Sequence, residues 1–222
     1  MNRDDLPDGG AAHFAQTVFW VKNLNPGIRV ELLIPDFEVD LSALKTVVDS
    51  GIDILNHNIE TVPRLYGKVR PGHTYECSRN ILKTAKSMRP QVLTKTGLML
   101  GVGETREEVM TTLEDLRSDD VDIVTLGQYL QPSPRQLKVD RYLDPTEFVD
   151  FKLAGEKLGL LQQSVKGDLS LFHQSQIPEK DSSRVDRCLN PMPCNGLEGR
   201  WVQEAQTLFL GLSHNGLTQW ML

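Results

Sequence analysis

The chain has 222 residues, 39% of them hydrophobic, which is enough for one substantial core. Its net charge of −6 argues against a phosphate-backbone partner, so no nucleic acid is expected. No apolar run approaches the ~20 residues of a transmembrane helix, and no membrane partner is expected. Three cysteines, Cys77, Cys188 and Cys194, are too few and too irregular for a disulfide framework. The sequence therefore predicts a soluble intracellular protein.

Helical and strand patterns alternate from residue 12 to about residue 160. Helices are predicted at residues 12–23, 41–50, 74–88, 105–117 and 145–158, and strands at 29–34, 52–55, 92–100 and 121–126. Asp144 is placed to cap the last helix, and Cys77 lies on the apolar face of the helix at 74–88, where it is predicted to be a small core residue. Alternation of this kind predicts an α/β fold of parallel βαβ units with right-handed crossovers.

The alternation stops near Gly159. Residues 161–222 contain frequent glutamines, with Pro, Ser and Asn scattered without period, and only residues 201–212 suggest a helix. We therefore expect two parts, an α/β unit at residues 1–160 and a divergent, poorly ordered tail at 161–222.

Polar or glycine-rich sequence lies at four places along this pattern. After the strand at 52–55 comes Asn56-His57-Asn58-Ile59-Glu60-Thr61, and similar stretches occupy residues 3–10, 97–104 and 127–132. Each alone also fits an ordinary loop, a helix cap or a frayed acidic terminus. Because ligands bind at the carboxyl ends of the strands in parallel α/β barrels, four such stretches together favour a ligand site.

These stretches resemble lipoyl synthase, in that family's order and at its approximate spacing. The resemblance is carried by Asn2–Gly10, Asn56–Pro63, Lys95–Gly101 and Leu126–Pro132, and it runs from Asn2 to about Gly159. The spacing Gly97-x-Met99-x-Gly101-x-x-Glu104 also matches a looser pattern of the wider radical S-adenosylmethionine (radical SAM) superfamily.

The resemblance implies about four βα units of a partial (β/α)6 barrel that uses S-adenosylmethionine and two [4Fe-4S] clusters. In this family a 5′-deoxyadenosyl radical removes hydrogen from C6 and C8 of a protein-bound octanoyl group, and an auxiliary cluster supplies the sulfur. The implied partners are an octanoylated lipoyl-carrier domain, on E2 subunits or the glycine cleavage H protein, and an electron donor. The implied compartment is the mitochondrion in a eukaryote, or the cytoplasm in a bacterium.

The resemblance also implies, position by position, which residues bind the cofactor. Those of the segment that meets the methionyl amino group are Asp4, Asp5, Gly9 and Gly10. Those of the ribose and methionyl end are Asn56, Asn58 and Glu60. Those that pack the adenine or lie near it are Gly97, Met99, Gly101, Gln128 and Tyr129. Amides donate and accept and carboxylates accept, which suits hydroxyls and an ammonium group.

The sequence departs from the family at the clusters. Its cysteines reproduce neither C-x3-C-x2-C nor C-x4-C-x5-C, the motifs that supply thiolate ligands, so we expect no metal ligands and no catalytic residues in this chain. Gln136 stands where the family commonly has His. We expect a lipoyl synthase that lacks its N-terminal part and diverges after residue 159. Two interpretations stay open: a locus for lipoyl synthase, or a non-catalytic fragment with residual nucleoside or partner binding. The ordered set of four stretches argues against a third interpretation, an unrelated barrel enzyme.

Overall fold

The computed structural model of the chain describes residues 6–165. Five parallel strands form one sheet in chain order. They are β1 (Glu31–Leu33), β2 (Ile54–Asn56), β3 (Leu93–Leu100), β4 (Ile123–Gln128) and β5 (Leu161–Val165). A parallel sheet whose neighbours follow one another in sequence is wound in one direction, as in a β/α barrel. The prediction of an incomplete parallel barrel is confirmed.

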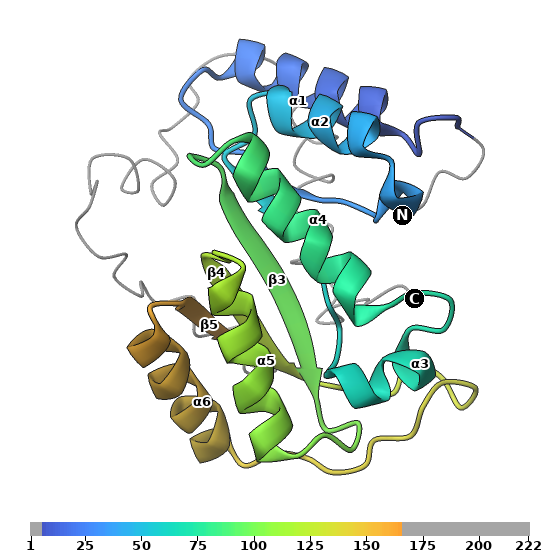
Figure 1. The fold of residues 1–222 in the computed structure, drawn as a ribbon, viewed down its shortest axis with the longest axis vertical. Coiled ribbons are helices and arrows are strands. Elements are labelled where there is room, and N and C mark those ends of the chain that lie inside the picture. The colour runs from blue at the N-terminus through green and yellow to red at the C-terminus, as the bar shows by residue number, and fades with distance from the viewer. Residues whose placement is uncertain (1–5, 166–222) are drawn as a thin grey trace, which may run out of the picture. The chain divides into compact units, whose positions relative to one another are not determined.

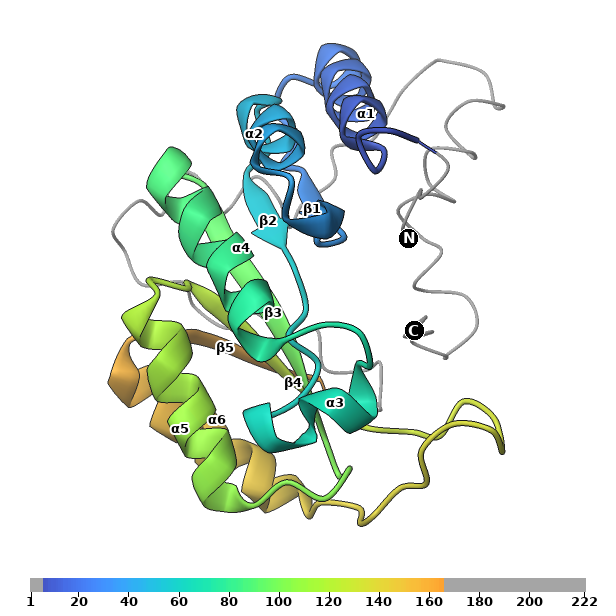
Figure 2. The same ribbon diagram turned by 45° about the vertical axis from the view of Figure 1, so that its right-hand side comes forward.

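One helix precedes the first strand, and the other helices lie between successive strands in the chain. The helices are α1 (Ala11–Leu24), α2 (Leu41–Asp49), α3 (Tyr66–Val69), α4 (Tyr75–Met88), α5 (Arg106–Ser118) and α6 (Pro145–Leu158), with short 3-10 turns η1 (Phe37–Val39) and η2 (Pro63–Leu65). In Figures 1 and 2, α4, α5 and α6 lie on the same face of the sheet. None of the helices in residues 6–165 is long and apolar enough to cross a membrane.

Local sequence explains where the helices begin. Thr105 caps α5, and its N–H is bonded in return by Glu108. Asp144 caps α6 in the same reciprocal way with Glu147, and Pro145 occupies the first helical position. The prediction that Asp144 is the cap of this helix is confirmed.

The side chains of the central strands alternate between two faces. Thr94, Leu98 and Leu100 are at most 1% exposed, and they point toward the helices. The alternate residues of β3, among them Lys95 and Gly97, point to the opposite face, which we call the inner face. The register extends this face to the neighbouring strands through Asn56, Thr125 and Gly127.

Two expectations are corrected within the described residues. Leu161–Val165 pairs with Ile123–Gly127, so the segment expected to be a poorly ordered tail begins with a strand. Its sequence, Leu-Gln-Gln-Ser-Val, has little apolar alternation, and the strand depends on backbone pairing with β4. Residues 166–222, including the helix expected at 201–212, lie outside the described residues.

Cys77 is the second correction. It is half-buried, and the buried face of α4 is instead formed by Tyr75, Ser78, Ile81, Leu82 and Ala85. On this face the Tyr75 hydroxyl donates to Asp115 Oδ2 at 3.1 Å and Ser78 Oγ accepts from the Tyr66 hydroxyl at 2.7 Å.

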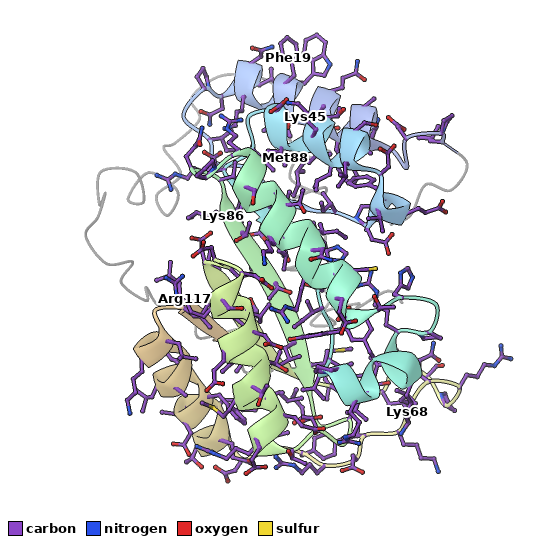
Figure 3. All side chains as sticks on the ribbon, in the orientation of Figure 1. Phe19, Lys45, Lys68, Lys86, Met88 and Arg117 are labelled. Carbon is purple, nitrogen blue, oxygen red and sulfur yellow. The ribbon has the colours of Figure 1, made fainter. Side chains whose placement is uncertain are left out.

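The first helix carries an aromatic pair outward. Phe19 and Trp20 are each more than half exposed, and their rings meet edge to face at 5.3 Å. Figure 3 shows Phe19 projecting from α1 on the side away from α2.

Candidate functional site

After β2 ends, the chain continues to pair with β3, but it contains one extra residue relative to β3. The N–H of His57 donates to Lys95 O at 3.0 Å, and the next bond runs from the N–H of Glu60 to Gly97 O at 3.0 Å. Three residues on one side therefore span two on the other, which is a β-bulge, and Glu60 adopts a left-handed φ of 65°. A bulge re-aims the side chain that follows it, and this one re-aims Glu60.

One oxygen of the Glu60 carboxyl group, Oε2, is buried and has no hydrogen-bond partner among the residues that the structure describes. Burial raises the pKa of Glu60 to about 7, although the Arg70 guanidinium and the Asn58 side chain act in the opposite direction. The ionised form of a buried carboxyl group like this one is stabilised by a ligand that brings a positive charge or a hydrogen-bond donor.

Unpartnered oxygens lie on both segments that flank β3. Within residues 6–165, Asn56 Oδ1, Glu60 Oε2, Thr61 Oγ1 and Thr125 Oγ1 are buried without a hydrogen-bond partner. Gly97 pairs with Thr125 on β4, and its carbonyl accepts from the N–H of Glu60 on the other side. Asn56 pairs with Lys95, two residues before Gly97 on the same face. Because buried polar atoms are almost always bonded, unpartnered oxygens on both sides of β3 favour a polar ligand that supplies hydrogen-bond donors.

His57 belongs to the fold and not to this site. Its Nδ1–H donates to Ile34 O at 3.0 Å, and its Nε2 lies 3.2 Å from Ser78 Oγ on α4. Burial and, to a smaller extent, the nearby Arg70 charge lower the pKa of His57 to about 4, so the ring is neutral. His57 therefore fastens the end of β2 to the helix layer.

Arg70 is hydrogen-bonded both to Ser78, the partner of His57, and to the bulge. Its Nη1 donates to Asn58 O at 2.9 Å and to Ser78 Oγ at 3.0 Å. Its Nη2 lies 3.9 Å from Asp36 Oδ2, at the end of β1. Arg70 thus fixes the backbone of Asn58 and places a positive charge near Glu60. Sequence analysis did not identify this residue, because it is the C-cap of a short helix, α3, that the sequence pattern does not predict.

The glycine-rich loop after β3 is stabilised by a glutamate of the same loop, which accepts two backbone hydrogen bonds. Glu104 accepts from the N–H of Gly101 at 2.6 Å and from that of Val102 at 3.0 Å. Gly101 has a φ of +97°, and a Cβ there would collide with the Gln128 side chain and the backbone of Arg141. The glycine is required both by its conformation and by the approach of Gln128.

Gln128 and Tyr129 hold the segment that follows β4. Gln128 Nε2 donates to Tyr129 O at 3.0 Å and to Arg141 O at 3.2 Å, and its Oε1 accepts from the N–H of Leu143 at 2.9 Å. Tyr129 is 4% exposed and its hydroxyl donates to Leu137 O at 2.8 Å. The polar atoms of both side chains are hydrogen-bonded to this segment. A ligand role for these residues stays a prediction.

The N-terminal glycines lie at the end of β1. Gly9 and Gly10 have φ of 59° and 92°, and a Cβ on Gly9 would lie 2.9 Å from the Phe37 ring. Phe37, Glu38 and Val39 form a left-handed turn with φ of 51°, 51° and 65°. Such strain in non-glycine residues costs about 1–3 kcal/mol each and is most often found at functional sites. Asp4 and Asp5 lie outside the described residues.

The expected site residues fall into three groups. Asn56, Asn58, Glu60, Gly97 and Met99 meet along β2 and β3; Gly101, Gln128 and Tyr129 meet where β3 and β4 end; Gly9 and Gly10 lie beyond β1. Thr125 was not expected. Its signal was a lone polar residue within the apolar strand sequence Ile-Val-Thr-Leu.

Residues 3–116 match the family model that is described as "Radical SAM superfamily". That match spans half of the chain. The chain belongs to the radical SAM superfamily. Lipoyl synthase from Caldanaerobacter subterraneus subsp. tengcongensis is 50% identical to it over 159 residues, 72% of this chain and 56% of the relative.

Two further comparisons agree. Mitochondrial lipoyl synthase from Bos taurus is 51% identical over 160 residues, 72% of this chain and 43% of the relative. The chain thus spans about half the length of the lipoyl synthases that it matches, and the resemblance to that family is confirmed over this part. A crystal structure of methylornithine synthase has a TM-score of 0.54 at 21% identity, covering 68% of this chain and 44% of the other, which shows a shared fold.

Proposed function

We propose that residues 6–165 of this radical SAM protein form the wall of a lipoyl synthase that holds S-adenosylmethionine. The observation that carries the proposal is the set of buried oxygens of Asn56, Glu60 and Thr125, on the segments that flank β3, which have no partner within residues 6–165. The ammonium group and the ribose hydroxyls of S-adenosylmethionine are the kind of donors that these oxygens lack.

Each residue has a defined task in this proposal. The Glu60 carboxylate and the Asn56 carbonyl oxygen accept hydrogens from the ribose and methionyl end, and Arg70 keeps the Asn58 backbone in place. Gly97 and Met99 provide the surface for the adenine, which Gly101, Gln128 and Tyr129 close from the ends of β3 and β4. Gly9 and Gly10 face the methionyl amino group; Asp4 and Asp5, assigned to the same segment by the family resemblance, lie outside the described residues. S-adenosylmethionine held here would supply a 5′-deoxyadenosyl radical, with release of methionine, on receiving one electron from a donor outside residues 6–165.

The residues that the structure describes do not fit a [4Fe-4S] cluster. Cys77 is a free cysteine on α4, and residues 6–165 contain no group of three His, Cys, Asp or Glu side chains able to hold a metal ion. We therefore assign no cluster ligand and no electron-transfer step to this part of the chain.

The reaction proposed for the whole enzyme is sulfur insertion at C6 and C8 of an octanoyl group on a lipoyl-carrier domain, with an electron donor as second partner. Its support is about 50% identity to lipoyl synthases over 72% of the chain. Relatives named as lipoyl synthases come from both bacteria and a mammalian mitochondrion, so both compartments stay predictions. The second candidate is a cofactor-binding module without catalysis, favoured by the absence of both cysteine motifs from the sequence.

Calorimetric titration with S-adenosylmethionine tests the binding role. We expect Glu60→Ala to weaken binding about tenfold or more, because the ligand loses a charge-assisted hydrogen bond. Glu114→Ala removes an exposed glutamate of α5 and serves as the matched control, with unchanged affinity. Unchanged affinity in Glu60→Ala would refute the role of Glu60.

Iron and sulfide analysis after anaerobic reconstitution separates the two candidate functions. Stoichiometric clusters support the catalytic function. S-adenosylmethionine binding without bound iron and sulfide supports the binding module.

A further inference from the structure

Two charged residues on the inner face have no task in the proposed function. They are Glu31 of β1 and Lys95 of β3. Lys95 Nζ lies 2.9 Å from Glu31 Oε1 and 3.1 Å from Oε2. The amide nitrogen of Asn56, on the strand between them, donates to Glu31 Oε1 at 2.8 Å. These three side chains therefore form one bonded group across three strands.

The register places this group directly beside the proposed site. Asn56 pairs with Lys95 on one side and with Leu33 on the other. Glu31 stands two residues before Leu33 and so shares the inner face with Asn56. The side chains of Lys95 and Glu31 are 19% and 33% exposed, so the pair is shielded on the inner face.

The bond from Asn56 to Glu31 decides which end of the amide meets a ligand. The two ends of an asparagine amide are nearly alike in shape, but one donates and the other accepts. A carboxylate only accepts, so Glu31 is satisfied only by Nδ2. The acceptor Oδ1 is thereby turned away from Glu31, and this buried atom has no partner in the described part of the chain.

We propose that Glu31, held by Lys95, is a positioning residue that makes Asn56 present an acceptor to the ligand. This inference rests on the proposed function, and it adds the reason why the site prefers a hydroxyl or ammonium group at Asn56. A ligand group that only accepts would face Oδ1 without compensation. Glu31 itself touches Asn56 and Lys95 and contributes through Asn56.

The test uses the 222-residue chain, S-adenosylmethionine as the probe, and titration calorimetry. Glu31→Gln offers an amide nitrogen as well as an oxygen, so it no longer dictates the orientation of Asn56. We expect about fivefold weaker binding, the equivalent of one ordinary hydrogen bond. Lys22→Met removes another part-buried ion pair, with Asp53 at 2.8 Å before β2, and is the matched control with unchanged affinity.

Two double variants distinguish positioning from a general loss of structure. In an Asn56→Ala background, Glu31→Gln should have no further effect on affinity, because its route is gone. Glu31→Gln combined with Asn56→Asp exchanges the donor and the acceptor and keeps the charge, and it should restore affinity to within about twofold. Unchanged affinity in Glu31→Gln, or an equal loss in the Asn56→Ala background, would overturn the proposal.

A second readout requires no ligand. The side-chain amide protons of Asn56, identified by their absence in Asn56→Ala, should show the shift and slow exchange of a carboxylate-bonded amide. Glu31→Gln should abolish that signature, whereas a signature that survives overturns the inference. If the parent chain does not bind S-adenosylmethionine, the proposed function fails, and this signal alone decides the orientation of Asn56.

Discussion

The Glu60 carboxyl group should make the unliganded chain less stable as the pH rises. Its pKa is raised from 4.5 to about 7, so the folded state holds the proton more tightly than the unfolded state does. The associated stability is fully present below pH 4.5 and is lost as the pH rises through about 7. Glu60→Gln removes the titration and keeps the shape.

The size of the effect follows from the difference between the two pKa values. A shift from 4.5 to about 7 corresponds to about 3 kcal/mol at about 1.4 kcal/mol per pKa unit. Glu60→Gln should therefore match the parent chain in acid and exceed its stability by about 3 kcal/mol in base. For a unit of this size, that equals roughly 5–10 °C in melting temperature.

His57 makes the comparison with a variant necessary. Its pKa falls from 6.5 to about 4 on folding, so its contribution to stability grows as the pH rises between these values. This opposes the Glu60 effect in the parent chain, but it cancels in the difference between parent and Glu60→Gln. Thermal melts at about pH 5 and about pH 8 measure that difference, with Glu114→Gln as an exposed control. A difference that does not grow with pH would refute the account of Glu60.

Two further predictions concern the loops around the site. Gly101→Ala should lower the free energy of unfolding, measured by urea titration, by about 2 kcal/mol or more, because Gly101 has a left-handed φ and touches Gln128. Gly127→Ala is the control. It should be tolerated in the same titration, because nothing lies within 4 Å of its Cβ position. Arg64→Gln should raise the pKa of Glu108 from about 2 toward 4.5, since the Arg64 hydrogen bond is the main cause of its low value, and carboxyl-carbon NMR titration measures it. A Glu108 pKa that stays near 2 would contradict that assignment.

The alternation of apolar residues predicted the sheet and most helices. The helix at 145–158 has the expected bounds, because Asp144, Pro145 and Gly159 mark both ends in the sequence. β5 was missed because its polar residues resemble a loop, and its strand exists through pairing with β4. Periodicity detects a face that packs, and it does not detect backbone pairing at a sheet edge.

The candidate site divides in the same way. Its polar residues were found because they follow strands in the sequence, as Asn56 and Glu60 do. The bulge that turns Glu60, and the group formed by Glu31 and Lys95, depend on register between strands that lie far apart in the chain. Arg70 was missed for the same reason, since it reaches Asn58 and Ser78 only in the fold.

The most direct test of the account is an amide chemical-shift map of the chain titrated with S-adenosylmethionine. We predict that the shifts concentrate at residues 9–10, 56–60, 97–101 and 125–129, where the proposed cofactor-binding residues lie. The amides of α1 and of the amino ends of the strands should not move. Shifts concentrated elsewhere, or no saturable shift at all, would contradict the claim that this wall holds the cofactor.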